Sequence, residues 1–130
     1  MSSAKYKIAM LVDDNEIDNF TNKRLLETYN FAEHIIVTGG GKSGIEFLST
    51  CKDEELPNII LLDIMMPIMD GFQFLEEFSK QRDAVKKACK IVMLSTSESF
   101  KDLNRANKSP YVYKFLNKPL SEQMLAAINV

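Results

Sequence analysis

The stretch that decides the fold is Asn58-Ile59-Ile60-Leu61-Leu62-Asp63, near the middle of the 130-residue chain. An unbroken run of large aliphatic residues between polar ones is typical of a strand that is buried on both faces. Such a strand belongs inside a parallel sheet that helices cover on either side. The run ends on a carboxylate, Asp63, at the point where the chain would leave the sheet.

Similar short runs recur along the chain and predict further strands. They are residues 8–12, 34–38, 90–94 and 111–116. Residues 8–12 and 90–94 are nearly continuous apolar runs, which again indicates burial on both faces. Residues 111–116 alternate more in polarity, as an edge strand would.

Amphipathic segments with helical spacing separate these strands. Their apolar faces are marked by Ile17, Phe20, Leu25 and Tyr29; by Ile45, Phe47, Leu48 and Cys51; by Phe72, Leu75 and Phe78; by Phe100, Leu103 and Ala106 within residues 98–108; and by Leu120, Met124, Leu125 and Ile128. Ser121 is the predicted N-cap of the last helix. Alternation of strand and helix predicts an α/β fold, a doubly wound parallel sheet with helices on both faces. We expect a single domain over residues 1–130, because no linker or repeat interrupts this pattern.

Composition argues against several classes of function. Lys+Arg number 16 and Asp+Glu 18, and the net charge of -2 leaves no basic surface for nucleic acid or for membrane lipid. No apolar run approaches the ~20 residues of a membrane span, and the N-terminus lacks the apolar core of a signal peptide. Cys51 and Cys89 stand far apart, and we expect both to be reduced. These features predict a cytoplasmic protein without direct nucleic-acid or membrane contact.

Polar residues follow most of the predicted strands. They are Asp13-Asp14 after 8–12, Asp63 after 58–62, Ser95-Thr96-Ser97 after 90–94, and Asn117-Lys118-Pro119 after 111–116. Ligands of an open parallel α/β sheet bind beyond the carboxyl ends of its strands. We therefore expect the carboxylates, the hydroxyl groups and the lysine to meet at a single edge of the sheet.

A divalent cation would relieve the repulsion between these carboxylates. Asp13, Asp14, Asp63 and Lys118 together carry a formal charge of -2. Mg²⁺ is a hard cation that prefers oxygen ligands, and it suits a site that also handles phosphate. The pattern predicts Mg²⁺-dependent phosphoryl transfer onto a carboxylate, which gives an acyl phosphate.

Four motifs, each at the end of its own strand, resemble those of the receiver domain of two-component response regulators. They are Leu11-Val12-Asp13-Asp14-Asn15, the run from Leu62-Asp63 to Gly71-Phe72, Met93-Leu94-Ser95, and Asn117-Lys118-Pro119. The resemblance covers essentially the whole chain in the family's order and spacing. It implies a flavodoxin-like (βα)5 fold with strand order 2-1-3-4-5.

The resemblance also implies how the acidic residues are used. Asp63 matches the aspartate that accepts the phosphoryl group. Asp14 would bind Mg²⁺ directly and Asp13 mainly through water. Asp63 and the backbone carbonyl of Met65 would be further ligands, so Mg²⁺ is the expected cofactor.

Other residues match positions that respond to phosphorylation in this family. Lys118 would pair with a phosphoryl oxygen, and its bond to Pro119 is typically cis in family members. Ser95 matches the switch hydroxyl, and Phe115 matches the switch aromatic residue that turns inward when the hydroxyl moves. The surface of the fourth helix, fifth strand and fifth helix would then change shape, and partners would bind that surface.

Two features depart from the family's usual pattern. Ser95 stands where Thr is common, and Thr96 beside it leaves open which hydroxyl acts, although the spacing from Met93-Leu94 favours Ser95. The stretch Asn107-Lys108-Ser109-Pro110 replaces a usual Gly-Ala pair, so the end of the fourth helix does not follow from the resemblance.

The expected function is that of a phosphoacceptor receiver. It would take a phosphoryl group on Asp63 from a histidine kinase or a histidine phosphotransfer protein and signal to a downstream protein partner. It would catalyse only its own phosphorylation and dephosphorylation, so we do not expect an enzyme. A haloacid-dehalogenase-like phosphatase is the alternative, but that chemistry needs a second aspartate where this chain has Met65. A pseudo-receiver that only binds partners is disfavoured, because the acidic, hydroxyl and lysine positions are all kept.

Overall fold

A parallel sheet forms the centre of the molecule. The computed structural model describes residues 4–96 and 100–129. Its strands are β1 (Tyr6–Val12), β2 (Ala32–Thr38), β3 (Ile59–Asp63), β4 (Lys90–Ser95) and β5 (Val112–Asn117). They pair in the order β2-β1-β3-β4-β5, and every pair is parallel. The predicted strands, their order and the α/β fold class are therefore confirmed.

Position in the sheet explains the hydropathy of each strand. β3 lies in the middle, and all of its residues are buried. β4 beside it is buried except for Lys90, whereas β5 at the edge has no fully buried residue. Because successive side chains of a strand point to opposite faces, a continuous apolar run supplies the cores on both sides of the sheet.

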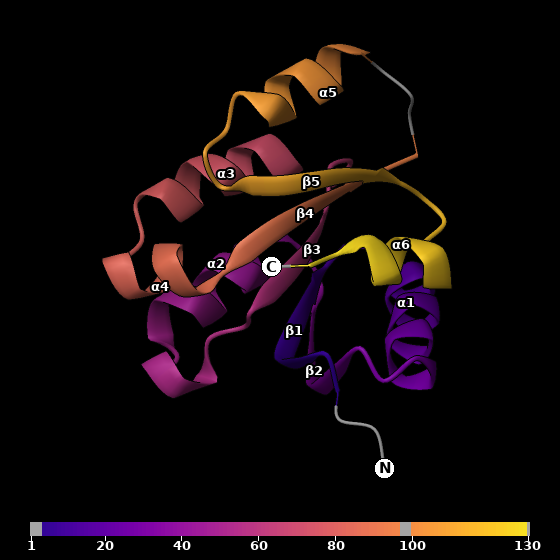
Figure 1. Ribbon diagram of the computed structural model, residues 1–130. Helices are drawn as coiled ribbons and strands as arrows, with labels where there is room; N and C mark the ends of the chain where they lie inside the picture. The colour runs from indigo at the N-terminus through magenta and orange to yellow at the C-terminus, as the bar shows by residue number, and fades with distance from the viewer. Residues whose placement is uncertain (1–3, 97–99, 130) are drawn as a thin grey trace.

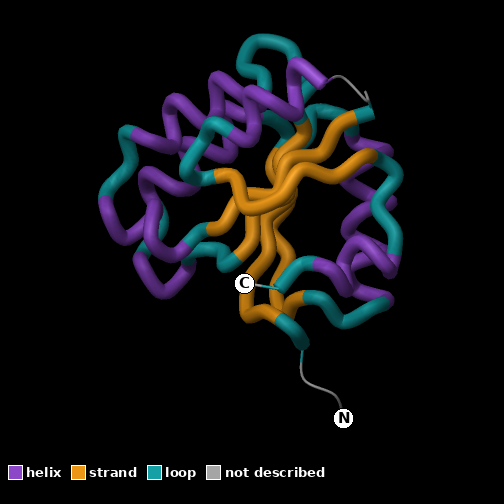
Figure 2. The backbone as a smooth tube through the Cα atoms, turned by 45° about the horizontal axis from the view of Figure 1, so that its top comes forward, coloured by secondary structure: helices purple, strands orange, loops and turns teal. Residues whose placement is uncertain are grey.

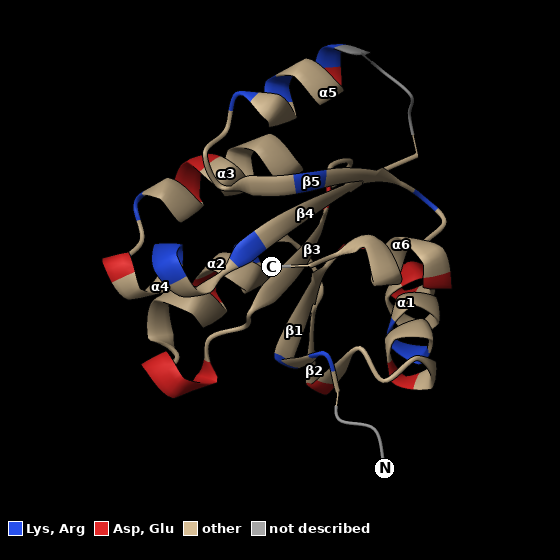
Figure 3. Ribbon diagram, in the orientation of Figure 1, with Lys and Arg blue, Asp and Glu red and all other residues tan. Residues whose placement is uncertain are grey.

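Helices cover both faces of the sheet (Figures 1 and 2). One layer contains α1 (Glu16–Thr28) and α6 (Glu122–Ala127). The other contains α2 (Gly41–Thr50), α3 (Gly71–Ser79), α4 (Asp83–Ala88) and α5 (Phe100–Asn107), with a short 3-10 turn, η1 (Asp53–Glu55), after α2. Lys and Arg are interspersed with Asp and Glu over both layers (Figure 3). Within the described residues, no helix has the length and apolar character needed to cross a membrane.

Each helical layer packs on its own hydrophobic core. On the α2–α5 side, Phe74 and Phe78 of α3 are fully buried against Met10 of β1 and Ile60 of β3. The core on the α1–α6 side joins alternate residues of the same strands to the two helices; its members include Ala9, Leu11, Ile59, Leu61, Leu26, Leu125 and Ile128. Helices therefore cover both faces of the sheet, and the edge formed by the carboxyl ends of the strands remains accessible to a ligand.

The predicted buried face of α1 is wrong except at Leu25, which packs against the core on the α1–α6 side. Ile17 and Phe20 are 75% and 64% exposed, and the helix instead buries Asn19, Asn22 and Leu26. The Asn19 amide can face the sheet because its Nδ2 donates a hydrogen bond of 2.8 Å to the backbone carbonyl of Asp13. An amide whose N–H groups donate to backbone carbonyls can be buried although it looks polar in the sequence, so hydropathy does not mark this face.

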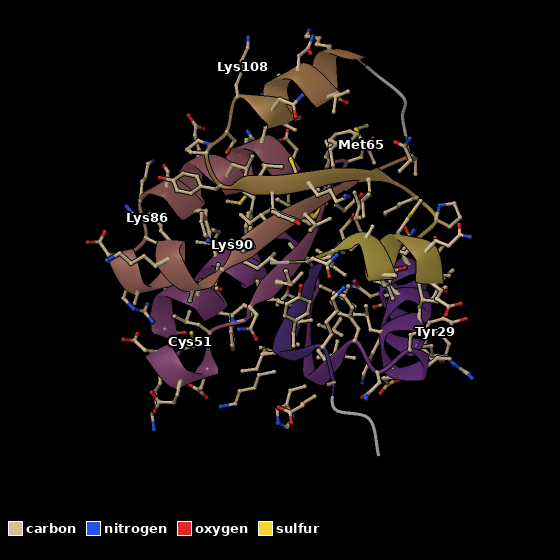
Figure 4. All side chains as sticks on the ribbon, viewed as in Figure 1. Tyr29, Cys51, Met65, Lys86, Lys90 and Lys108 are labelled. Carbon is tan, nitrogen blue, oxygen red and sulfur yellow. The ribbon has the colours of Figure 1, made fainter. Side chains whose placement is uncertain are left out.

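The helix α4 was not predicted. It has six residues, of which only Val85 is buried, so the sequence shows no apolar periodicity that would predict a helix there. Arg82 fixes its start, because the guanidinium donates to the carbonyl oxygens of Leu48 and Cys51 and pairs with Asp53. Cys51 (Figure 4) and Cys89 are both free thiols, as expected.

The last helices follow the prediction where the structure describes them. The predicted fourth and fifth helices correspond to α5 and α6. Residues 98 and 99 of the predicted 98–108 segment lie outside the described residues. The Ser121 hydroxyl accepts a hydrogen bond from the Met124 backbone N–H, so the predicted N-cap is confirmed.

One irregularity interrupts the pairing of β4 with β5. Ile91 lies opposite Val112, but the next residue, Val92, lies opposite Lys114, so Tyr113 is an extra residue in β5. Beyond this bulge Phe115 lies opposite Met93, and it packs against the core on the α2–α5 side.

Candidate functional site

Carboxylates gather at the carboxyl edge of the sheet. Asp13 and Asp14 follow β1, and Asp63 ends β3, the strand paired directly with β1. One carboxylate oxygen from each residue lies within 4.8 Å of those of the other two. Asp13 and Asp63 are buried and Asp14 is exposed. This arrangement is the one that the sequence predicts.

The first strand-to-helix turn holds Asp13 in place. Its Oδ1 accepts a hydrogen bond of 3.0 Å from the backbone N–H of Asn15, and its carbonyl oxygen accepts one from Asn19. Asn15 is also the N-cap of α1, where its side chain accepts from the backbone N–H groups of Ile17 and Asp18. The start of α1 and the position of the Asp13 carboxylate are thus fixed together.

The turn after β3 is equally constrained. The Gly71 N–H donates to the carbonyl oxygen of Ile64, and a Cβ at Gly71 would stand 2.9 Å from the Ile64 Cα and 3.0 Å from the Asp63 carbonyl oxygen. Asp70 and Gln73 form a capping box at the start of α3. Only glycine permits this close approach, which brings the β3–α3 turn back beside Asp63.

Two residues of this turn are exposed. Met65 is 68% exposed and lies at the cleft (Figure 4). Ile68 is 95% exposed and has a φ of 70°, a conformation that β-branched residues rarely adopt. The turn therefore holds one strained residue near the acidic cluster.

Lys118, which follows β5, places its ammonium against the acidic cluster. Its Nζ lies 2.8 Å from Asp13 Oδ2, 2.9 Å from Asp18 Oδ2 and 3.1 Å from Asp63 Oδ1. The Lys118 backbone N–H donates to the Ser95 carbonyl oxygen, which continues the β4–β5 pairing to the edge of the site. The bond to Pro119 is cis, as the resemblance implied.

The pKa values of Asp63 and Lys118 are both raised above their ordinary values. The pKa of Asp63 is raised from 3.8 to about 6, chiefly by burial and also by the charges of Asp13 and Asp14, and the hydrogen bond from Lys118 opposes this rise. Burial lowers the pKa of Lys118, but its hydrogen bonds with Asp13, Asp18 and Asp63 outweigh this, so the pKa rises and the ammonium stays charged. One positive charge does not neutralise the cluster, and additional positive charge would stabilise the ionised Asp63.

The cluster lies in a cleft of about 570 Å³. Its walls are formed by Asp13, Asp14, Asn15, Glu16, Ile17, Asp18, Asp63, Met65, Thr96 and Lys118. Oxygen donors dominate this set, and hard divalent cations prefer such donors. The residues present therefore fit a Mg²⁺ ion.

The candidate switch residues lie beside this cleft. Ser95 ends β4 and is 1% exposed, whereas Thr96 is exposed and lines the cleft. Ser95 and Met93 point to the same face of the sheet, and Phe115 lies opposite Met93. Ser95 and Phe115 thus share the face that carries α5, whereas Thr96 lies on the cleft side.

Sequence reasoning missed Asp18. An acidic residue three positions after an N-cap usually accepts from the N-cap backbone N–H, as in a capping box. Here that N–H of Asn15 donates to Asp13 instead, and the Asp18 carboxylate pairs with Lys118. Residues 18 and 118 are far apart in the chain, and no local pattern connects them.

Fold and site together define an α/β domain with an acidic cleft and a lysine at the carboxyl edge of a parallel sheet. Residues 9–129 match the family described as the response regulator receiver domain. FilR2 of Methanothrix harundinacea, a probable methanogenesis regulatory protein, is 34% identical over 88% of this chain and 73% of its own length. The protein belongs to the response regulator receiver family, whose members are signalling modules.

Solved structures show the same fold. A two-component response regulator from Cytophaga hutchinsonii has a TM-score of 0.86 at 26% identity, covering 95% of this chain and 92% of its own. The receiver domain of a sensor histidine kinase from Pseudomonas aeruginosa, solved with magnesium in its active-site cleft, has a TM-score of 0.74 at 17% identity, covering 92% and 91%.

Proposed function

We propose that the protein is a phosphoacceptor receiver of a two-component system or phosphorelay, in which Asp63 takes a phosphoryl group from a phosphohistidine. The donor would be a histidine kinase or a histidine phosphotransfer protein. The observation that carries the proposal is the Asp63 carboxylate, buried beside two further carboxylates and 3.1 Å from the Lys118 ammonium. A carboxylate oxygen of Asp63 attacks the phosphorus, the P–N bond breaks, and the histidine nitrogen leaves with the bonding pair and takes up a proton.

Asp13, Asp14 and Asp63 would hold Mg²⁺, with the backbone carbonyl of Met65 as a further ligand. The compact set of oxygen donors supports this assignment, and so does the magnesium in the cleft of the Pseudomonas receiver domain. When bound, the ion supplies positive charge that favours the ionised Asp63 and the incoming phosphoryl oxygens. The raised pKa of Asp63 indicates why this chain needs that charge.

Lys118 would bind a phosphoryl oxygen once the acyl phosphate forms. Its ammonium already lies over Asp63, and its backbone is tied to the end of β4. A flexible stem with a point charge can follow the added group over a short distance. Lys118 therefore links the chemistry at β3 to the strands β4 and β5.

Signalling would pass through Ser95 and Phe115 to the surface formed by α5, β5 and α6. A hydroxyl drawn toward the phosphoryl group would leave room for Phe115, which is half-buried on the same face. The Arg105 guanidinium of α5 lies 3.9 Å from the ring centroid of Phe72 on α3, so a shift of α5 would alter this contact. A downstream protein partner would bind the altered surface, without direct contact to nucleic acid or membrane.

The phosphatase alternative gains no support from the site. That chemistry needs a carboxylate two residues beyond the nucleophile, and Met65 at this position offers a thioether. The protein would accordingly catalyse only its own phosphorylation and dephosphorylation, and it would not be an enzyme with other substrates.

Intact-mass measurement after incubation with acetyl phosphate and Mg²⁺ tests the proposal. Wild type should gain the mass of one phosphoryl group, and EDTA should prevent the gain. Asp63→Asn should gain none, whereas Asp83→Asn, an exposed aspartate at the start of α4, should behave like wild type. An unlabelled wild type, or a labelled Asp63→Asn variant, would show that the assignment is wrong.

A further inference from the structure

Asp18 is the solvent-facing partner of Lys118. Its side chain is 41% exposed, against 5% for Asp13 and 7% for Asp63, yet its Oδ2 lies 2.9 Å from the Lys118 Nζ. It lies in the first turn of α1 and lines the same cleft as the cluster. It is outside the group of carboxylates close enough to hold a metal ion together. Its role must therefore be sought in the contact with Lys118.

Three carboxylates already surround the ammonium of Lys118 in this state. The ammonium donates hydrogen bonds to Asp13 Oδ2 and Asp18 Oδ2, and Asp63 Oδ1 lies 3.1 Å away as an ion-pair partner. A phosphoryl oxygen that binds Lys118 must compete with these acceptors. Water can replace Lys118 as the partner of the partly exposed Asp18 at little cost in free energy. Asp13 and Asp63 are buried, so losing the ammonium would leave their negative charges without a partner.

Helix capping does not explain this contact. Any carboxylate in the first turn of α1 benefits from the helix dipole, and Glu16 has that benefit as well. Glu16 also lines the cleft, but among the described residues the carboxylates that contact the Lys118 ammonium are those of Asp13, Asp18 and Asp63. Asp18 and Glu16 thus bring the same charge to the same turn and differ in their contact with Lys118.

We propose that Asp18 competes with the phosphoryl group for Lys118 and thereby lowers the affinity of the site for that group. In the resting protein Asp18 holds the ammonium and adds negative charge beside the place where the phosphoryl oxygens arrive. On phosphorylation Lys118 exchanges Asp18 for a phosphoryl oxygen, and Asp18 turns to water. Asp18 is a positioning residue in this scheme, and the inference rests on the proposed phosphorylation of Asp63.

The test is the dissociation constant of beryllofluoride, a phosphoryl mimic, measured by amide NMR at saturating Mg²⁺. Asp18→Asn keeps the shape and an oxygen acceptor but removes the charge, and it should tighten binding about threefold to tenfold, as for a partly exposed ion pair. Asp18→Glu keeps the charge within reach of Lys118 and should stay near the wild-type value. Glu16→Gln removes the same charge without the contact, and its gain should be less than about twofold.

A second readout separates competition for Lys118 from general effects. The Mg²⁺ affinity of Asp18→Asn, measured by calorimetry without beryllofluoride, should not rise, because loss of a negative charge does not favour a cation. A parallel rise in both affinities, an equal gain in Glu16→Gln, or unchanged or weaker beryllofluoride binding in Asp18→Asn would overturn the role of Asp18.

The same experiment distinguishes this role from the proposed function. Wild type that binds no beryllofluoride would contradict the phosphoacceptor assignment itself. Wild type that binds it with the same affinity as Asp18→Asn would contradict only the role of Asp18. Asp18→Asn and Asp18→Glu should both fold, because the Asp18 side chain is partly exposed and its substitution leaves the hydrophobic cores intact.

Discussion

Replacement of Asp63 by asparagine should stabilise the fold at neutral pH. The pKa of Asp63 is raised from 3.8 to about 6, chiefly by burial. A shift of roughly two units corresponds to about 3 kcal/mol of free energy by which folding disfavours the ionised form. This figure already includes the attraction of Lys118, whose hydrogen bond opposes the shift. Asparagine has the same shape without the charge, so the gain should be about 2–3 kcal/mol.

The gain should depend on pH with a definite sign. Because the folded state binds the proton more tightly than the unfolded chain, wild type keeps the stability from this group below a pH of about 4 and loses it as the pH rises through about 6. The amide that replaces the carboxyl group in the variant does not titrate. The two proteins should therefore have nearly equal free energies of unfolding at the acidic end of this range and should diverge toward neutrality.

Urea unfolding followed by circular dichroism, in EDTA and at several pH values across this range, measures the difference. Asp14→Asn is the matched control, because it removes a charge from the same cluster at an exposed position, and it should gain less than about 1 kcal/mol. Added Mg²⁺ should stabilise wild type more than Asp63→Asn and so narrow the gap. A variant no more stable than wild type near neutral pH in EDTA, or a gain that persists unchanged at the acidic end, would refute the reasoning.

Other substitutions test the metal site, the switch hydroxyl and the β3–α3 turn separately. Asp14→Ala should weaken Mg²⁺ binding at least about tenfold in titration calorimetry, because it removes a carboxylate from the cluster, and an unchanged affinity would remove the metal site. Ser95→Ala should accept a phosphoryl group yet fail to shift the amide NMR signals of α5 and β5 when beryllofluoride binds; if Thr96→Ala loses the response instead, the acting hydroxyl is Thr96. Ile68→Asn should raise the free energy of unfolding in urea by about 1 kcal/mol, since it relieves an exposed β-branched residue at positive φ; a loss of stability would contradict the strain.

The sequence predicted the sheet well because burial acts directly on its strands. Ile59 to Leu62 lie in the central strand between two helical layers, so every position must be apolar and the run stands out. The family's motifs then located Asp13, Asp63 and Lys118, which the fold brings to one edge. Local sequence patterns were sufficient for prediction wherever burial or a motif constrained several neighbouring residues at once.

Prediction failed where the deciding contact is distant in sequence or made by the backbone. Asn19 is buried with its Nδ2 donating to the Asp13 carbonyl oxygen, and hydropathy alone assigns such a residue to the surface. The helix α4 depends on the distant contacts of Arg82. Asp18 gains its role only when the end of β5 brings Lys118 to α1. None of these contacts leaves a periodic trace in the sequence.

The extra residue in β5 decides which helical layer Phe115 faces. Because side chains alternate along a strand, a shift of the pairing by one residue reverses the facing of everything that follows it. If regular pairing continued from Ile91 and Val112 without the bulge, Phe115 would lie opposite Leu94 and point toward α1 and α6, and Lys114 would take its place opposite Met93. Under the proposed mechanism, the pairing register of β5, rather than the identity of its aromatic residue, would select the helical layer that receives the signal. Lys118 also follows the bulge, so the same extra residue sets the facing of the ammonium that lies 3.1 Å from Asp63.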